Sequence, residues 1–472
     1  MVAAALVPFG FLFFFWTFLS GCGGKQILQD QSVLRDQALS VLTPVQTLRI
    51  DKGVQPTQKF HAALRISEAF LNDAAARLLE AEVVPSKFEN PVDFTIPFVG
   101  TKLVFRPGIS VKNPRLVFTG TCPECIRISM HVVGQLALDV NLTRGSSATR
   151  MFDRAALSGD VSLKGRLIPL YTGGIPSIGL QLDPIDDNDL SIETNVPVSG
   201  LDSLLTAAVR SQIRGALAVP RNNTFALLPL RSLVIPGSRI TVTQLAFTLV
   251  NQPEGELFIG VGLNLSTPPE IDLPTRGRRL RGNHFALLVG QNTFTDATRV
   301  WMAEGLMPAR FDYEGNPDPA GPVVIELKRM ELFDDRYEAY SRMWHIGRPP
   351  FWREYKLTGT TSIRSEQLAI KNDTAVLVAK AGPNQLIDMA LKLQKTSLKT
   401  SLEGLSSRFP RQIGFPFGSP ARLSAELIAE ELQTDQSRFT LYGSVLFQSI
   451  VSSTPPPGGK AAPTGIPVKH LP

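Results

Sequence analysis

The sequence predicts an α+β fold of two large units, each a highly curved antiparallel sheet wrapped around a long amphipathic helix. Three observations lead to this class. Several segments alternate apolar and polar residues with the period of two that marks a strand with one buried face. Each half of the chain also contains two segments with apolar residues at helical spacing. The order of these segments in the first half is repeated in the second half.

Length and composition support a folded chain of more than one domain. The chain has 472 residues, and a prior of about 150 residues per domain allows two or three. Hydrophobic residues make up 43% and charged residues 19%, so there is ample apolar surface for a core. The net charge of +6 is dispersed and no Lys/Arg block is interleaved with aromatics, so we expect no nucleic-acid partner.

The first 21 residues are interpreted as an export signal. Their apolar run is shorter than a comfortable membrane span and ends in Leu19-Ser20-Gly21-Cys22. This ending resembles the lipobox of bacterial lipoproteins, which implies cleavage before Cys22 and lipidation of its thiol. No Lys or Arg precedes the apolar run, unlike in the usual signal. The alternatives are an uncleaved anchor and a plain export signal with a structural cysteine.

The residues that follow Cys22 indicate which bacterial membrane a lipidated chain would be attached to. Gly23 and Gly24 follow it, without an Asp beside the cysteine. The lipoprotein resemblance therefore implies an outer-membrane lipoprotein of the bacterial cell envelope, facing the periplasm or the cell surface.

Two further cysteines, Cys122 and Cys125, form an even pair if Cys22 carries lipid. They lie between two strand-like runs, where Pro123 and Glu124 predict a tight turn. A redox CxxC is expected at the start of a helix, and a zinc site needs two more ligands that are not nearby. A turn-stapling disulfide or two free thiols are therefore favoured over redox chemistry.

Composition shifts divide the chain into consecutive segments. A Pro-, Gly- and Arg-rich stretch in the middle reads as a linker, and the Pro-rich end reads as a flexible tail. The predicted segments are 1–21 (signal peptide), 22–57 (tether), 58–270 (first barrel-like domain), 271–282 (linker), 283–451 (second barrel-like domain) and 452–472 (tail).

The second domain repeats the first at the scale of a whole fold. Phe70 and Phe294, each at the start of a helix after an apolar strand, differ by 294 − 70 = 224. Long amphipathic helices are predicted at 199–217 and 384–405. The closing strands repeat at an offset of 182, which equates Val261 with Gly443. A sheet wrapped around a helix can leave an apolar gap along its axis, which suits acyl chains.

Two segments carry a resemblance to a known family. "RFPRQIGFPFGSPARLSAELIAEELQTDQSRFTLYGSVLF" (408–447) and "HFALLVGQNTFTDATRVWMAEGLM" (284–307) resemble the bactericidal/permeability-increasing protein and its relatives in the tubular lipid-binding superfamily. The resemblance implies two barrel-like domains in pseudo-twofold arrangement, each with an apolar pocket for lipid tails. The family's disulfide links distant elements, whereas Cys122 and Cys125 are neighbours, and the basic tip of its lipopolysaccharide-binding members is not evident.

Apolar residues on the predicted helices are the candidates for lining such pockets, with plain core packing as the alternative for each. They are Phe70, Leu71, Leu78, Leu205, Val209, Ile213, Phe294, Val300, Trp301, Ile387, Leu391 and Leu398.

An acidic, a basic and an aromatic group of residues each have a functional and a simpler structural interpretation. The acidic group Asp183, Asp186, Asp187 and Asp189 can hold calcium or form a solvated loop. The cluster Arg276, Arg278, Arg279 and Arg281 can meet anionic headgroups or belong to a soluble linker. The aromatics Trp344, Phe351, Trp352 and Tyr355 suit a water–lipid boundary or loop packing.

No enzyme, cofactor or metal site is predicted. The sequence has five histidines, His61, His131, His284, His345 and His470, and lacks HExxH, GxSxG and GxxxxGK[ST] motifs. We expect an exported, lipid-anchored protein that binds and passes phospholipids or other acyl-chain lipids. The alternative is a structural or interaction lipoprotein that uses the same fold as a scaffold. A hydrolase of envelope lipids is a third hypothesis without an identified nucleophile.

Overall fold

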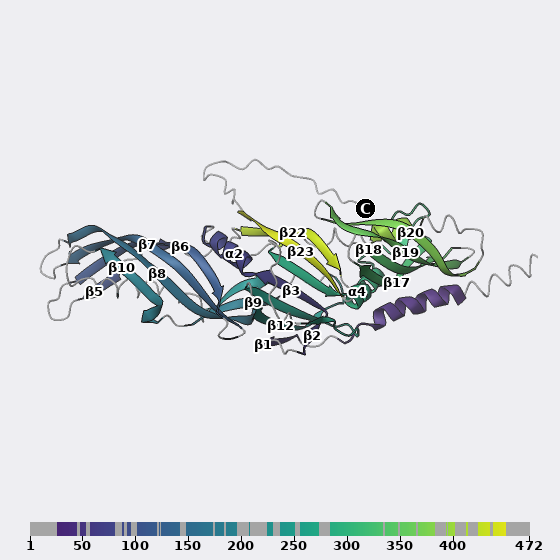
Figure 1. Ribbon diagram of the computed structural model, residues 1–472, viewed down its shortest axis with the longest axis horizontal. Helices are drawn as coiled ribbons and strands as arrows, with labels where there is room; N and C mark the ends of the chain where they lie inside the picture. Colours follow the sequence, from purple (N-terminus) through teal and green to yellow (C-terminus); the bar gives the residue numbers. More distant parts are fainter. Residues whose placement is uncertain are drawn as a thin grey trace, which may run out of the picture.

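The computed structural model is elongated, with most of its described residues in strands (Figure 1). It describes residues 26–44, 48–52, 57–80, 87–88, 92–95, 102–119, 122, 124–141, 148–172, 175–183, 186–195, 207, 224–229, 237–250, 255–272, 284–333, 336–347, 350–364, 367–382, 393, 395–401, 412–413, 423–434 and 438–449. No helix in these ranges is long and apolar enough to cross a membrane.

A central sheet joins the two halves of the chain. It has eight strands and takes four from each half. In spatial order they are β1 (Arg49–Lys52), β12 (Val242–Val250), β13 (Glu256–Leu263), β3 (Ala62–Ser67), β15 (Phe285–Gly290), β23 (Arg438–Ser449), β22 (Leu423–Thr434) and β21 (Gln412–Ile413).

A second large sheet, built only from the first half, lies at one end of the molecule (Figure 1). Its strands in order are β11 (Thr224–Pro229), β9 (Ile175–Leu182), β8 (Ala148–Thr172), β7 (Cys125–Asn141), β6 (Lys102–Phe118) and β4 (Lys87–Phe88), with β10 (Leu190–Asn195) on β8 and β5 (Val92–Thr95) on β6. Cys122 and Cys125 form a disulfide at the turn between β6 and β7.

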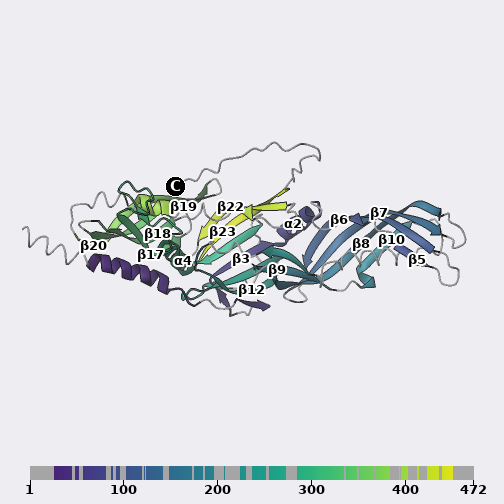
Figure 2. The ribbon, with the colours of Figure 1, turned by 180° about the vertical axis from the view of Figure 1, so that it is seen from behind.

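The opposite end carries a five-stranded sheet from the second half, seen from both sides in Figures 1 and 2. Its strands are β16 (Arg310–Phe311), β17 (Val323–Phe333), β18 (Arg336–His345), β19 (Phe351–Arg364) and β20 (Gln367–Ala381). A small sheet pairs β2 (Lys59–Phe60) with β14 (Ile271–Asp272).

Few helices lie within the described ranges. They are α2 (Glu68–Glu80), α4 (Gln291–Ala303), a helix over residues 26–40, a helical stretch at 395–401 and the short 3-10 turn η1 (Asp187–Asp189). The predicted α+β class is confirmed. The barrels wrapped around long helices stay a prediction, because the described sheets are open and most of 199–217 and 384–405 lies outside the described residues.

The segment predicted as a tether, 22–57, contains regular structure. Residues 26–40 are helical, and β1 adds to the central sheet by pairing in parallel with β12. Only Ala38 of the helix is buried, while Ile27, Gln31 and Leu34 are half-buried on the same face. Such a narrow stripe gives a weak periodic signal in the sequence, which explains why the helix was not predicted.

The two halves meet at β3 and β15 through a repeated hydrogen-bond pattern. The backbone N–H of Ser67 donates to His284 and that of Gly290 donates to His61, each at 3.0 Å. His61 donates to Val261 at 3.0 Å, and His284 donates to Gly443 at 2.9 Å. The strand offset is therefore 443 − 261 = 182, as predicted from the sequence.

The same pattern corrects the predicted offset at the helices. His61 and His284 are equivalent, so the offset at β3 and β15 is 284 − 61 = 223 rather than 224. Each helix begins directly after its strand, so Phe70 corresponds to Thr293 and Phe294 to Leu71. The error arose because matching two phenylalanines ignored the register that the backbone bonds fix.

Strand β13 of the central sheet is buried on both faces. Leu257, Ile259 and Val261 of β13 face the core that also contains the apolar residues of β6 to β9. Phe258 on the opposite face packs edge-on against Phe60, with ring centroids 6.0 Å apart. Burial of both faces explains why the sequence of β13 is almost continuously apolar.

In β17 the apolar pattern changes phase at a bulge. Val323, Ile325 and Leu327 are buried, and then Met330 and Leu332. The pairing with β18 shifts between Leu327 and Arg329, which returns the later residues to the core face.

A buried ion pair ties β3 to β13. Arg65 Nε donates to Glu256 Oε2 at 2.9 Å and Arg65 Nη2 donates to Glu256 Oε1 at 2.8 Å. The two side chains are 8% and 1% exposed. Bidentate geometry offsets the cost of removing both charges from water.

We expect Glu256→Gln to lower the free energy of unfolding by about 3–5 kcal/mol, because it leaves the Arg65 guanidinium buried without a counter-charge. Urea titration of wild type and variant measures the loss. The double variant Arg65→Met/Glu256→Leu should recover much of it, since no charge stays buried. Equal loss in the single and double variants would contradict this role.

His61 makes the fold sensitive to acid. Its Nδ1 accepts the Leu263 N–H at 3.1 Å, so the ring proton is on Nε2, which donates to the Thr267 carbonyl at 2.9 Å. Burial lowers the pKa of His61 below its ordinary value of 6.5. Its stabilising contribution is therefore complete above about pH 6.5 and is lost as the pH falls through the folded-state pKa.

Thermal unfolding between pH 7.5 and pH 5 tests this contribution. The Tm of wild type should fall on acidification, and His61→Gln, which keeps an acceptor and a donor without titrating, should reduce the fall. His131→Gln, on the partly exposed face of β7, is the comparison variant, and His61→Gln should reduce the fall more than it does. An unaltered pH profile in His61→Gln would exclude His61 as the group concerned.

Candidate functional site

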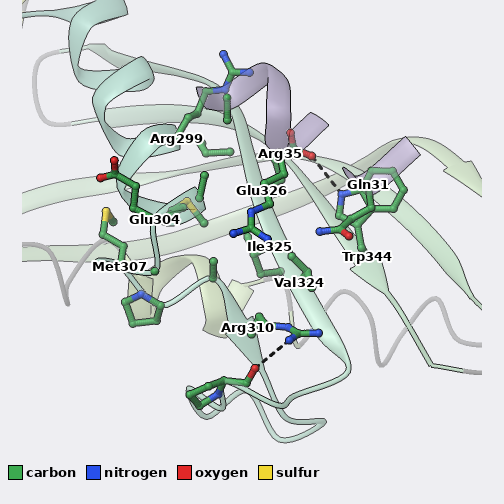
Figure 3. A pocket seen from close by; sticks show the side chains of 18 of the residues that line it. Gln31, Arg35, Arg299, Glu304, Met307, Arg310, Val324, Ile325, Glu326 and Trp344 are labelled. Carbon is green, nitrogen blue, oxygen red and sulfur yellow. Dashed lines mark hydrogen bonds between the residues drawn. The ribbon is translucent and has the colours of Figure 1, made fainter. Parts of the chain in front are cut away.

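A cleft of about 590 Å³ lies between the helix at 26–40 and the second half of the chain (Figure 3). In both views of the ribbon this helix runs beside β17 (Figures 1 and 2). The apolar lining is Ala38, Met302, Ala303, Met307, Pro308, Ala309, Pro317, Pro319, Val324, Ile325, Leu327 and Trp344. The polar lining is Gln31, Arg35, Arg299, Glu304, Arg310, Asp318 and Glu326, with Gly305 between them.

The end of α4 shapes one wall. The N–H of Gly305 donates to Met302 at 3.2 Å and that of Leu306 donates to Trp301 at 2.9 Å, which is the Schellman pattern of helix termination. Gly305 has φ +74, the left-handed conformation that this motif requires. The chain therefore turns sharply after Glu304, which brings both Met302 and Met307 to the cleft.

Glu304 connects this wall of the cleft to Ser238 and Arg239 of the first half by hydrogen bonds. Its carboxylate accepts hydrogen bonds from Ser238 Oγ at 3.1 Å and from the backbone N and Nε of Arg239 at 3.0 and 3.1 Å. Ser238 Oγ also accepts the Trp301 indole N–H at 3.1 Å. The charge of Glu304 is thus compensated by Arg239 at the edge of the cleft.

Glu326 is a half-buried acid that lines the cleft. The Trp344 indole donates to its Oε2 at 3.2 Å. Burial raises the pKa of Glu326, although Arg299, Arg342 and Lys328 act in the opposite direction. The same face of the sheet continues with Arg342, whose guanidinium lies 4.1 Å from the centre of the Trp352 ring.

The predicted pocket residues do not line this cleft. Phe70, Val300 and Leu398 are buried in core clusters, and Leu71, Phe294 and Trp301 pack against those clusters. Phe70 stacks on Phe447 with ring centroids 5.7 Å apart. Leu78 belongs to α2. Leu205, Val209, Ile213, Ile387 and Leu391 lie outside the described residues, as does Cys22. The role of these residues in lipid pockets stays a prediction.

The other predicted groups have the following positions. Trp344 lines the cleft from β18, and Phe351, Trp352 and Tyr355 lie on β19 rather than in a loop. Asp189 pairs with Lys164 at 3.0 Å, and no group of three metal-ligating side chains is found in the described part of the chain. Arg276, Arg278, Arg279 and Arg281 lie outside that part.

The histidines are dispersed. His61 and His284 each accept a backbone N–H at 3.1 Å. His131 bonds to Asp160 at 2.9 Å, and His345 bonds to the Tyr313 hydroxyl at 2.8 Å. His470 lies outside the described residues. These positions give the hydrolase hypothesis no common site in the described structure.

Sequence reasoning missed the cleft itself. Met302, Met307 and Arg310 come from a helix end, a loop and a short strand, and no periodicity connects them. The partner across the cleft, Arg35, precedes Met302 by 302 − 35 = 267 residues. The segment "MAEGLMPARF" (302–311) is the one sequence feature that indicates this wall of the cleft, because two methionines flank a glycine at which a helix ends.

Comparison with known proteins gives distant likenesses. No protein-family model and no curated protein matches the chain. A crystal structure of lipopolysaccharide binding protein is similar with 14% identity over 83% of this chain and 100% of that chain, at a TM-score of 0.36. P47 of Clostridium botulinum E1 is similar with 9% identity over 82% of this chain and 99% of that chain, at a TM-score of 0.34.

Gly305 provides a test of how the cleft wall is built. A Cβ at this position meets no atom within 4 Å, so Gly305→Ala should cost only the left-handed backbone strain, about 1–2 kcal/mol. At Gly315, with φ +92, a Cβ comes within 3.1 Å of Thr396, so Gly315→Ala should cost more. Urea denaturation of both variants measures the difference, and equal costs would show that the surroundings of Gly305 are tighter than described.

Proposed function

We propose that this chain is an exported lipoprotein of the bacterial envelope that binds acyl-chain lipids and passes them on. The observation that carries the proposal is the cleft beneath helix 26–40. Its volume of about 590 Å³ lies within the usual range for small-molecule sites. Apolar side chains such as Met302, Met307 and Val324 supply most of its lining, with a few charged groups between them.

Desolvation supplies the driving force for binding. Burying one CH₂ group is worth about 0.8 kcal/mol, so several carbons of an acyl chain can offset the entropy lost on binding. Methionine side chains adapt to chains of different shape because they are unbranched and flexible. No catalytic group is required for this function.

The proposed anchor lies close in sequence to the cleft. Only residues 23–25 separate Cys22 from helix 26–40, which covers the cleft. At about 3.5 Å per residue, this spacer reaches on the order of 10–14 Å. A lipidated Cys22 would hold the cleft near the membrane surface, where its ligand is found, and outer-membrane attachment is part of the proposal.

A second candidate is a structural or interaction lipoprotein whose interior is filled by side chains. The observation favouring it is the packing of the first-half core, where Val132 and Leu138 are fully buried and Phe70 is 6% exposed. This alternative predicts that purified protein carries no lipid.

A cleft-filling substitution distinguishes the two candidates. Ala303 is half-buried and lines the cleft, so Ala303→Trp should displace bound lipid by occupying its space. The readout is the lipid extracted from the purified full chain and identified by mass spectrometry, with Tm measured in parallel. We expect at least a fivefold loss of lipid per protein.

Ala76→Trp is the matched control, because Ala76 is also a half-buried helix residue but lies on α2, away from the cleft. It should keep the lipid content of wild type. Absence of lipid from wild-type protein would reject the binding proposal in favour of the scaffold. Lipid that remains in a folded Ala303→Trp variant would place the ligand elsewhere.

A further inference from the structure

The two ends of helix 26–40 are held very differently. Just after its C-terminal end, the N–H of Thr43 donates to the Asn264 carbonyl at 2.9 Å, and the N–H of Ser266 donates to the Val41 carbonyl at 2.7 Å. The side chain of Val41 also packs against a buried core cluster. Backbone bonds in both directions therefore fix the chain to the first half at this end of the helix.

The rest of the helix, residues 26–37, has no comparable attachment. Within the part of the chain that the structure describes, none of these residues has a hydrogen bond or an ion pair to a residue outside the helix. Contact with the remainder of the protein comes from the half-buried side chains of Ile27, Gln31 and Leu34. Ile27 and Leu34 do not pack against any buried core cluster of the described residues.

This weakly attached part of the helix lies over the cleft. Gln31 and Arg35 line the same cleft as Val324 and Met307 (Figure 3). An element that makes few buried contacts separates from its surroundings at a low cost in free energy. A helix of about 12 residues is also marginal in water on its own, so residues 26–37 should lose their helical hydrogen bonds when they leave the cleft.

We propose that helix 26–40 is a lid over the cleft, which pivots at residues 41–44 and lifts from its N-terminal end. This inference rests on the proposed function and adds to it the way in which a ligand enters. Residues 23–25 join the lifting end to Cys22, the proposed lipid anchor. The cleft therefore opens at the end of the helix that is held nearest to the membrane.

Amide hydrogen exchange of the full chain, followed by mass spectrometry, tests whether the helix lifts. Helix α4 is the internal reference, because it has a similar length but carries the fully buried residues Thr298 and Val300. The amides of residues 30–37 should exchange about a hundredfold faster than those of residues 295–302. Equal protection of the two helices would overturn the proposal.

Cysteine labelling measures access to the cleft. Met302→Cys places a thiol in the cleft at a site that is only 6% exposed, so its reaction with a maleimide requires the lid to move. Ile27→Ser and Leu34→Ser remove contacts of the lid and should each speed this labelling about tenfold over the background of wild type. Val33→Ser, at an exposed site of the same helix, is the control and should leave the rate unchanged. Met343→Cys, buried but not part of the cleft lining, should stay unlabelled in every lid variant.

The failure of the lid and the failure of the proposed function are distinguishable, because neither readout needs a bound lipid. A labelling rate of Met302→Cys that the two serine variants leave unchanged overturns the lid and leaves lipid binding intact. Labelling of Met343→Cys at the same increased rate also overturns it, since the opening is then not confined to the helix. If labelling rises as expected but no lipid is extracted from wild type, the proposed function fails and the lid stands.

Discussion

The antiparallel pairing of β3 with β15 is the constraint on which the rest of the structure depends. These two strands are the only direct backbone link in the central sheet between the first and second halves among the described strands. At each end of the pair the carbonyl of a histidine accepts a backbone N–H from the other half, and the histidine ring accepts a further N–H from a closing strand of its own half. A slip of one residue here would turn every side chain of β3 to the wrong face.

The pairing of β3 with its other neighbour, β13, determines the packing on that side. Arg65 on β3 is placed beside Glu256 on β13, where neither charge reaches water and each needs the other. Phe70, in the first turn of the following helix, contacts the rings of His284 and Phe447 from the second half. The core of the first half therefore continues across the junction into Phe285 and Val445 of the second half, which also has a core cluster of its own around β17 to β19.

The position of the cleft also depends on the β3–β15 junction, because the elements that form its wall follow β15 directly in the chain. Strand β15 leads directly into α4, and α4 stops at Gly305, whose left-handed backbone turns the chain along the cleft wall. Glu304 fixes that turn to Arg239, just before β12 of the central sheet. Helix 26–40 is held at its end by Leu39 and Leu42, which pack with Ile240 and Val300. Residues from three distant parts of the chain thus form one site.

The α+β class, the strand-rich halves and the repeat of the closing strands at an offset of 182 were predictable from local pattern, because alternation with period two is a local property. The offset of 223 at the histidines was not predictable in this way, since backbone hydrogen bonds between distant strands set the register. Apolar residues at helical spacing, among them Phe70, Val300 and Leu398 on three separate helices, show that a helix face is buried but not what covers it. The cleft of Arg35, Met302 and Met307 has no local pattern, because proximity of distant segments is a property of the fold.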